Sequence, residues 1–183
     1  MTSDPNASSD PLEIERVFLL DRMPDVPRSL SCVAEHWKIE QGYLSPSESV
    51  PGHGPVEGRL RRITHEDGSI ELKHTVKSGL GLVRTERERA MDHSEFQALW
   101  PATAGRRIQK TRLRIVVGGQ IWEIDQFSDR DLVLAEAELP TVETPLSIPE
   151  WLQPHIIREV TEEGAFRNFH LATQQGFLEP DPP

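Results

Sequence analysis

Short stretches in which hydrophobic and polar residues alternate dominate this sequence. Such alternation is typical of β-strands, because successive side chains point to opposite faces. Turn signals separate the stretches, among them Asp67-Gly68 and the pair Gly118-Gly119, which favours a two-residue hairpin. The pattern predicts eight strands, at residues 12–20, 36–44, 57–64, 69–78, 82–90, 107–117, 120–127 and 131–139.

Helical patterns are fewer than strand patterns. Asp92-His93-Ser94 before EFQALW predicts a capped helix that ends at Pro101. Residues 28–36 indicate a second, short helix. Near the C-terminus, Thr161 followed by two glutamates resembles a helix start, and apolar residues at helical spacing follow it. We therefore expect an α+β fold that is mainly antiparallel β.

Both ends of the chain differ from this pattern. Residues 1–11 and 175–183 are polar and rich in proline, which predicts disordered tails around one domain at 12–174. The four tryptophans are expected to pack on the exterior of the sheet against helices.

Seven of the predicted strands carry charged or polar residues at positions i and i+2, so that these residues share one strand face. A solvated outer face is the ordinary explanation for one such strand. Two carboxylates on one strand face repel each other, however, and the acidic pairs recur at both ends of the chain. The sets are Glu13/Glu15, Arg59/Arg61, Lys73/Thr75/Lys77, Arg84/Glu86/Glu88, Lys110/Arg112/Arg114, Glu123/Asp125 and Glu136/Glu138.

Closing these strands into a barrel would bring the acidic and basic sets around one lumen. Carboxylates are the oxygen ligands that a hard divalent cation prefers. Arginine and lysine bind phosphate oxygens, arginine as a bidentate fork. The pattern therefore indicates metal-assisted chemistry on a phosphoanhydride.

The formal net charge of −10 argues at first against a polyanionic ligand. Its distribution changes that conclusion, because the segment from Arg59 to Arg114 holds thirteen basic and seven acidic residues. The rest of the chain holds seven basic and twenty-three acidic residues. So large an asymmetry suggests a charged partner.

Other features exclude whole classes of protein. The single Cys32 cannot form an internal disulfide, and zinc-type cysteine spacing is absent from the sequence. No apolar run approaches the roughly 20 residues of a membrane span. The first residues do not resemble a signal peptide. We expect a cytoplasmic protein with neither a membrane nor a nucleic acid as partner.

The ordered charged motifs resemble those of the CYTH superfamily, the triphosphate tunnel metalloenzymes. Glu13-Ile14-Glu15-Arg16 resembles the start of the ExExK signature, and the similarity covers roughly residues 12–174. The motifs that follow in the same order are GRLRR (58–62), TVKSG (75–79), RTERE (84–88), QKTR (109–112), WEIDQF (122–127), LAEAEL (134–139), EVT (159–161) and FRN (166–168). This resemblance implies a closed eight-stranded tunnel barrel with flanking helices and a C-terminal plug helix.

The resemblance also implies roles for individual residues. Lys110 and Glu88 are the expected catalytic residues: Lys110 would position the attacking water, and Glu88 would orient neighbouring bases or hold a second metal. Mg²⁺ or Mn²⁺ would be bound by Glu13, Glu15, Asp125, Glu136 and Glu138. The triphosphate would be bound by Arg59, Arg61, Lys77, Arg84, Lys110, Arg112 and Arg167.

The expected function is metal-dependent hydrolysis of short linear phosphate chains, with inorganic triphosphate favoured. Val17 stands where the signature has a lysine, so a non-catalytic module that binds polyphosphate or a nucleotide is one alternative. Cyclisation of ATP, as in class IV adenylyl cyclases, is another, although no stretch reads as an adenine pocket. The expected partner is triphosphate, polyphosphate or a nucleoside triphosphate, and the expected state is a monomer or homodimer.

Overall fold

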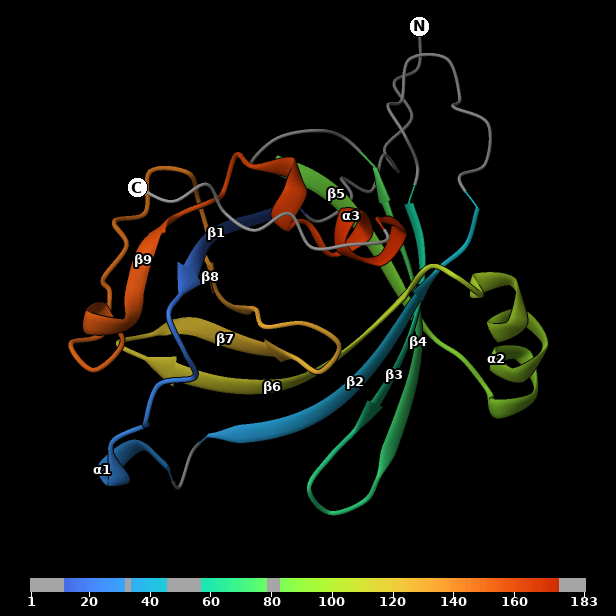
Figure 1. The fold of residues 1–183 in the computed structure, drawn as a ribbon, viewed down its shortest axis with the longest axis horizontal. Helices are drawn as coiled ribbons and strands as arrows, with labels where there is room; N and C mark the ends of the chain where they lie inside the picture. The colour runs from blue at the N-terminus through green and yellow to red at the C-terminus, as the bar shows by residue number, and fades with distance from the viewer. Residues whose placement is uncertain (1–11, 32–33, 46–56, 79–82, 175–183) are drawn as a thin grey trace, which may run out of the picture.

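The computed structural model describes residues 12–31, 34–45, 57–78 and 83–174 (Figure 1). The two predicted tails, 1–11 and 175–183, lie outside these ranges. Within the ranges, none of the helices is long and apolar enough to cross a lipid bilayer.

Nine strands form the sheet, and eight of them match the predicted strands to within two residues at each end. The ninth, β9, was not predicted, because it is only four residues long and its side chains are mostly exposed, without alternation. The strands are β1 (Leu12–Leu20), β2 (Glu35–Tyr43), β3 (Glu57–Thr64), β4 (Ile70–Ser78), β5 (Val83–Ala90), β6 (Arg107–Val117), β7 (Gln120–Phe127), β8 (Val133–Glu138) and β9 (Ile156–Glu159).

All neighbouring strands of the sheet are antiparallel, in the order β5-β4-β3-β2-β6-β7-β8-β1-β9. The sheet curls, and β1 also pairs with β5 through Leu12–Ile14 opposite Val83–Thr85 (Figure 1). Gly118 and Gly119 join β6 to β7 with φ angles of 59° and 82°, the left-handed conformation that this hairpin requires. The predicted hairpin is therefore confirmed.

The helices are short and differ in part from the prediction. The α-helices are α1 (Arg28–Ser31), α2 (His93–Leu99) and α3 (Asn168–Thr173), with 3₁₀ turns η1 (Trp100–Thr103), η2 (Gln153–His155) and η3 (Gly164–Phe166). Asp92 caps α2 as predicted, its side chain accepting a hydrogen bond from the Glu95 amide. The α-helix ends at Leu99, just before Pro101 as predicted, and Pro101 lies in the first turn of η1, where no N–H is needed.

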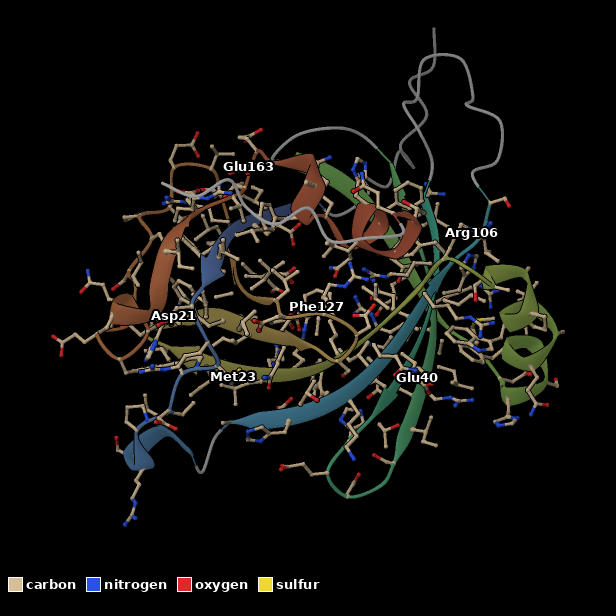
Figure 2. All side chains as sticks on the ribbon, viewed as in Figure 1. Asp21, Met23, Glu40, Arg106, Phe127 and Glu163 are labelled. Carbon is tan, nitrogen blue, oxygen red and sulfur yellow. The ribbon has the colours of Figure 1, made fainter. Side chains whose placement is uncertain are left out.

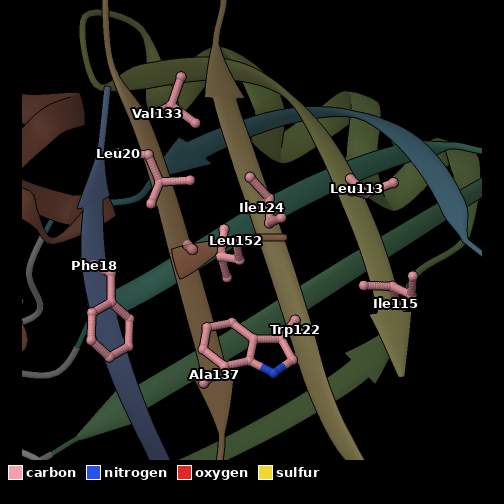
Figure 3. Close-up of a cluster of buried hydrophobic side chains, with 10 residues drawn as sticks. Phe18, Leu20, Leu113, Ile115, Trp122, Ile124, Val133, Ala137 and Leu152 are labelled. Atoms are coloured by element: carbon pink, nitrogen blue, oxygen red, sulfur yellow. The ribbon is translucent and has the colours of Figure 1, made fainter. Parts of the chain in front are cut away.

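The face of β6, β7, β8 and β1 that carries Trp122 and Ile124 is the outer face, and it is apolar. Its side chains pack against Leu152 and α1 in the main hydrophobic core (Figure 3). A smaller cluster joins Leu60 and Leu72, on β3 and β4, to Phe96 of α2. Both clusters cover the sheet from outside, so the residues that face the other way are left to line its interior.

We call the opposite side, which carries Lys110, Arg112 and Asp125, the inner face. One end of it is apolar, because residues of α3 and its approach pack there. The strand residues in this apolar cluster are Leu19, Tyr43, Ile108, Phe127 and Leu134, with Val17 at its margin. The C-terminal helix therefore lies against the inner face, although it begins at Asn168 rather than near Thr161 as predicted.

Candidate active site

The strand register places the predicted charged sets on the inner face. Residues directly opposite each other in an antiparallel pair share a face. Arg112 lies opposite Asp125, and Arg114 lies opposite Glu123, which in turn lies opposite Glu136. On β3, β4 and β5, Arg59 lies opposite Thr75, and Thr75 lies opposite Glu88. Figure 2 shows nitrogen- and oxygen-bearing side chains gathered inside the curve of the sheet, around the labelled Phe127.

Arg112 is at the centre of a buried ion network. Its Nε lies 2.6 Å from Asp125 Oδ1 and its Nη2 lies 2.6 Å from Asp125 Oδ2, a bidentate pair. The same Nη2 is 2.9 Å from Glu136 Oε2, and Nη1 pairs with Glu123. Arg112 is 3% exposed and Asp125 is 0% exposed. Such charges are stable away from water only because each has several partners.

Lys110 extends this network toward the C-terminal helix. Its ammonium pairs with Asp125, lies 3.3 Å from Asn168 Oδ1 and lies 5.6 Å from the centre of the Phe127 ring. The residue is only 2% exposed. Lys110 thus connects β6, β7 and α3.

A second polar group lies on β2, β3, β4 and β5. The Arg59 guanidinium donates to Thr75 Oγ1 at 3.1 Å, and the Thr75 hydroxyl donates to Glu88 Oε2 at 3.0 Å. Glu88 also pairs with Lys73 at 3.0 Å. Arg61 Nε donates to Gln41 Oε1 at 3.1 Å. Four predicted residues, Arg59, Arg61, Lys110 and Arg112, thus present cations on one face.

The pKa values reflect this crowding of charge. Burial and the neighbouring Arg59 and Arg112 lower the pKa of Arg61 to about 9, which leaves it a cation at neutral pH. Burial and Arg112 lower the pKa of Lys110 to about 8, although Asp125 and Glu136 act the other way. Burial by itself would raise the pKa of Asp125, but Arg112 and Lys110 hold it well below its usual range.

The acids predicted to bind metal divide into two groups. Asp125 and Glu136 pair with Arg112. Glu15 and Glu138 lie directly opposite each other on β1 and β8, as two oxygen donors on one face. Among the described residues, no group of three or more Asp, Glu, His or Cys side chains is placed to hold an ion. The pair of Glu15 and Glu138 therefore fits part of a divalent-cation site, and a third ligand would have to come from elsewhere.

Several predicted residues contribute less to this picture. The side chains of Glu13, Lys77 and Arg84 lie outside the described part of the structure, although the backbone of Glu13 pairs with that of Arg84. Arg167 lies between η3 and α3, and among the described residues its side chain takes no part in the ion network.

Val17, which replaces the signature lysine, also lies on the inner face, opposite Glu136. It packs at the margin of the apolar cluster, and Phe166 and Phe169 pack against the same cluster. Its backbone is bonded to the approach to α3, with Val17 N donating to Thr161 Oγ1 at 3.0 Å and Val160 N donating to Val17 O at 2.8 Å. Val17 thus helps to hold the C-terminal segment against the inner face.

Neutral residues of the inner face were missed by a search for charged pairs. Gln41 and Tyr43 are buried, and Gln41 Nε2 donates to the Tyr43 hydroxyl at 2.6 Å. Asn168 is the last residue of the FRN motif but had no role assigned to it, and it reaches Lys110 from the C-terminal helix. Trp37, expected on the exterior, lies on the inner face opposite Arg112, because β2 presents its odd-numbered residues there. The i,i+2 spacing of Gln41 and Tyr43 was the available signal.

The arrangement suits a ligand that carries many negative charges. Buried guanidinium groups offer several donors in fixed directions, as phosphate oxygens require. The neighbouring carboxylates keep these cations stable without ligand and could turn toward a metal when phosphates replace them. A network of both signs therefore fits a phosphate chain accompanied by a divalent cation.

Comparison with known proteins agrees with this chemistry. An inorganic triphosphatase from Nitrosomonas europaea is 37% identical over 166 residues, which are 87% of this chain and 96% of that protein. An inorganic triphosphatase from Acetivibrio thermocellus is 28% identical over 113 residues, or 60% of this chain and 68% of that protein. A comparison with models of protein families finds no match.

Solved structures show the same fold. The crystal structure of the inorganic triphosphatase NE1496 superposes with a TM-score of 0.57 at 32% identity, covering 89% of this chain and 95% of that one. The protein PH1819 from Pyrococcus horikoshii has a TM-score of 0.51 at 16% identity, covering 72% and 80% of the two chains, and supports the fold alone.

Proposed function

Because the chain belongs to the inorganic triphosphatase family, within the CYTH superfamily, we propose that it hydrolyses inorganic triphosphate on the inner face of its sheet. The observation that carries this proposal is the set of buried cations on that face, namely Arg59, Lys110 and Arg112 together with the partly exposed Arg61. Buried charged groups with perturbed pKa values cluster at functional sites, and cations of this kind suit an anionic ligand. A phosphate chain is such an anion.

Arg59, Arg61 and Arg112 are proposed to hold the phosphate oxygens. Their guanidinium groups come from β3 and β6 and are close enough for Arg59 and Arg112 to lower the pKa of Arg61. Three further residues are proposed as phosphate contacts. Lys77 and Arg84 are proposed because of their positions on β4 and β5, and Arg167 because it directly precedes α3.

A divalent cation, Mg²⁺ or Mn²⁺, is proposed to be held by Glu15 and Glu138, with Glu13 from the same strand as a third ligand. The register of Glu15 opposite Glu138 supports this set. Asp125 and Glu136 would become further ligands of the cation once phosphate replaces them as the partner of Arg112. When bound, the cation would neutralise charge on the phosphate oxygens and polarise the phosphorus that is attacked.

Lys110 and Glu88 are proposed as the groups closest to the chemistry. An amine whose pKa is about 8 can exchange a proton with water near neutral pH, so Lys110 is suited to position the attacking water. Glu88 pairs with Lys73 and accepts a hydrogen bond from Thr75, and so would orient the basic side chains around Arg59.

We also propose that the sheet closes into a tunnel with α3 as a plug at one end. The pairing of β1 with β5 supports closure, and the apolar cluster around Leu171 and Phe127 supports the plug.

The test is phosphate release from inorganic triphosphate, compared with pyrophosphate, long polyphosphate, ATP and thiamine triphosphate, with Mg²⁺ and with Mn²⁺. We expect triphosphate to have the highest kcat/KM and a chelator to stop the reaction. Glu15→Gln and Glu138→Gln should lose this metal-dependent release, whereas Glu143→Gln, an exposed acid outside the strands, should keep it. If the protein bound triphosphate but released no phosphate from it with either Mg²⁺ or Mn²⁺, it would be a binding protein instead.

A further inference from the structure

The side chain of Asn168 makes a contact that helix formation does not explain. Asn168 is the first residue of α3, and its Oδ1 lies 3.3 Å from Lys110 Nζ. Within the described ranges this is the side chain's hydrogen bond, and it does not cap its own helix. The N-cap position of α3 is occupied by Arg167, so the Asn168 side chain has no capping role. Its amide oxygen is directed toward a buried lysine on β6.

We propose that Asn168 is a positioning residue that fixes the direction of the Lys110 ammonium, so that activity depends on the seating of the C-terminal helix. The proposal rests on the proposed function. Lysine carries a compact charge on a flexible four-carbon stem, with three donors that rotate freely. Asp125 takes one N–H and Asn168 a second, which gives a defined direction to the third N–H and to the lone pair that replaces it once Lys110 loses its proton.

Asp125 alone would not define that direction. Both of its carboxylate oxygens are also bonded by Arg112, at 2.6 Å each. A phosphate chain that engages Arg112 would disturb this arrangement and with it the pairing of Asp125. Asn168 comes from a different element and is not bonded to Arg112, so it can hold the ammonium while the ion network rearranges.

Packing of the neighbouring α3 residues holds Asn168 in place. Leu171 and Ala172 of α3 are buried among Tyr43, Ile108 and Phe127 on the inner face. The Phe169 ring meets the Tyr43 ring edge-on at 5.3 Å between centres. Such packing restricts the helix far more than one hydrogen bond could.

Val17 on β1 also helps to hold α3 in this position. It borders the apolar cluster, and its backbone bonds Thr161 and Val160 on the approach to α3. A valine where the family signature has a lysine therefore favours a firmly seated helix. The seated helix brings Asn168 to the lysine on β6.

The experiment compares Asn168→Leu, which keeps the volume and removes the acceptor, with Asn168→Asp, which keeps an oxygen at the same position. Thr173→Ala is the matched control, because the Thr173 hydroxyl bonds only the backbone of its own helix among the described residues. Steady-state kinetics with triphosphate and Mg²⁺ give kcat and KM. Calorimetry with triphosphate and a chelator gives binding without turnover, and thermal unfolding reports folding.

We expect Asn168→Leu to lower kcat by about ten- to a hundredfold, the effect of losing a hydrogen bond to a charged group. KM and the calorimetric affinity should change less than about twofold, because the proposed phosphate contacts stay in place. Asn168→Asp should recover most of kcat, and Thr173→Ala should match the wild type.

Three results would overturn the inference. Asn168→Leu could match Thr173→Ala in kcat, it could raise KM and weaken binding together, or Asn168→Asp could be as slow as Asn168→Leu while unfolding at the wild-type temperature. Each of these leaves the proposed function intact, because the wild type is active in all of them. A wild type that releases no phosphate from triphosphate would instead refute the proposed function, and the inference with it.

Discussion

Replacing Arg112 by methionine tests whether the inner-face charges form one network. Methionine fills a similar volume without the charge, and it leaves the buried Asp125 together with Glu123 and Glu136 lacking their shared partner. Removing one partner of a buried ion pair typically costs about 3–5 kcal/mol of unfolding free energy. For a chain of this length that corresponds to a fall of about 6–20 °C in the unfolding temperature.

The unfolding free energy that Arg112→Met loses should depend on pH in a defined direction. Arg112 and Lys110 hold the pKa of Asp125 below its unfolded value, so the stabilisation is present above about pH 4 and fades as the pH falls further. The difference between Arg112→Met and the wild type should therefore be large at pH 7 and shrink in acid. Calorimetric unfolding at several pH values measures it.

Arg89→Met is the matched control for this measurement. Arg89 pairs with Glu95 at the surface, where an ion pair contributes little to stability. We expect this variant to unfold close to the wild-type temperature at all pH values. A single inner-face network is excluded if Arg112→Met unfolds at the same temperature as the control, or if its loss of stability grows in acid.

Three further predictions concern single positions. Gly42→Ala should destabilise the fold by about 1–3 kcal/mol in chemical denaturation, because the new Cβ would lie 2.5 Å from Thr103 Oγ1, and unchanged stability would contradict this packing. The kcat/KM for triphosphate should rise with pH and level off above about pH 8 as Lys110 loses its proton, and Lys110→Arg should lack that step. Val17→Lys should lower the unfolding temperature without a gain in rate, because the ammonium enters the margin of an apolar cluster; a large gain in kcat would show that the valine had impaired the site.

The strands could be predicted because each has its own local pattern of alternation. β9 could not, since Ile156–Glu159 has no such pattern and its position is set by pairing with β1. The start of α3 was placed too early for a related reason. Thr161 and the two glutamates after it look like a helix start, but the Thr161 hydroxyl accepts a hydrogen bond from Val17 N, and η3 intervenes before Asn168.

The charged face was predictable from i,i+2 spacing, but its internal pairing was not. Arg112 meets acids from β7 and β8, and that choice depends on register between strands, which single-strand periodicity does not contain. Gln41 carries no charge, so a search for charged sets passed over it, and Asn168 appeared only within the FRN motif, with no role predicted for it. Trp37 was placed outside because large aromatic side chains usually lie in apolar cores, whereas here the pleat of β2 turns it inward.

A crystal structure with a non-hydrolysable imido analogue of triphosphate and Mg²⁺ is the most direct test of phosphate binding on the inner face. Phosphate oxygens should lie within hydrogen-bond distance of Arg59, Arg61 and Arg112, and Glu15 and Glu138 should bind the metal. Asp125 should then have given up at least one of its two bonds to Arg112. An analogue bound outside the inner face, with the pair of Arg112 and Asp125 unchanged, would contradict phosphate binding on that face.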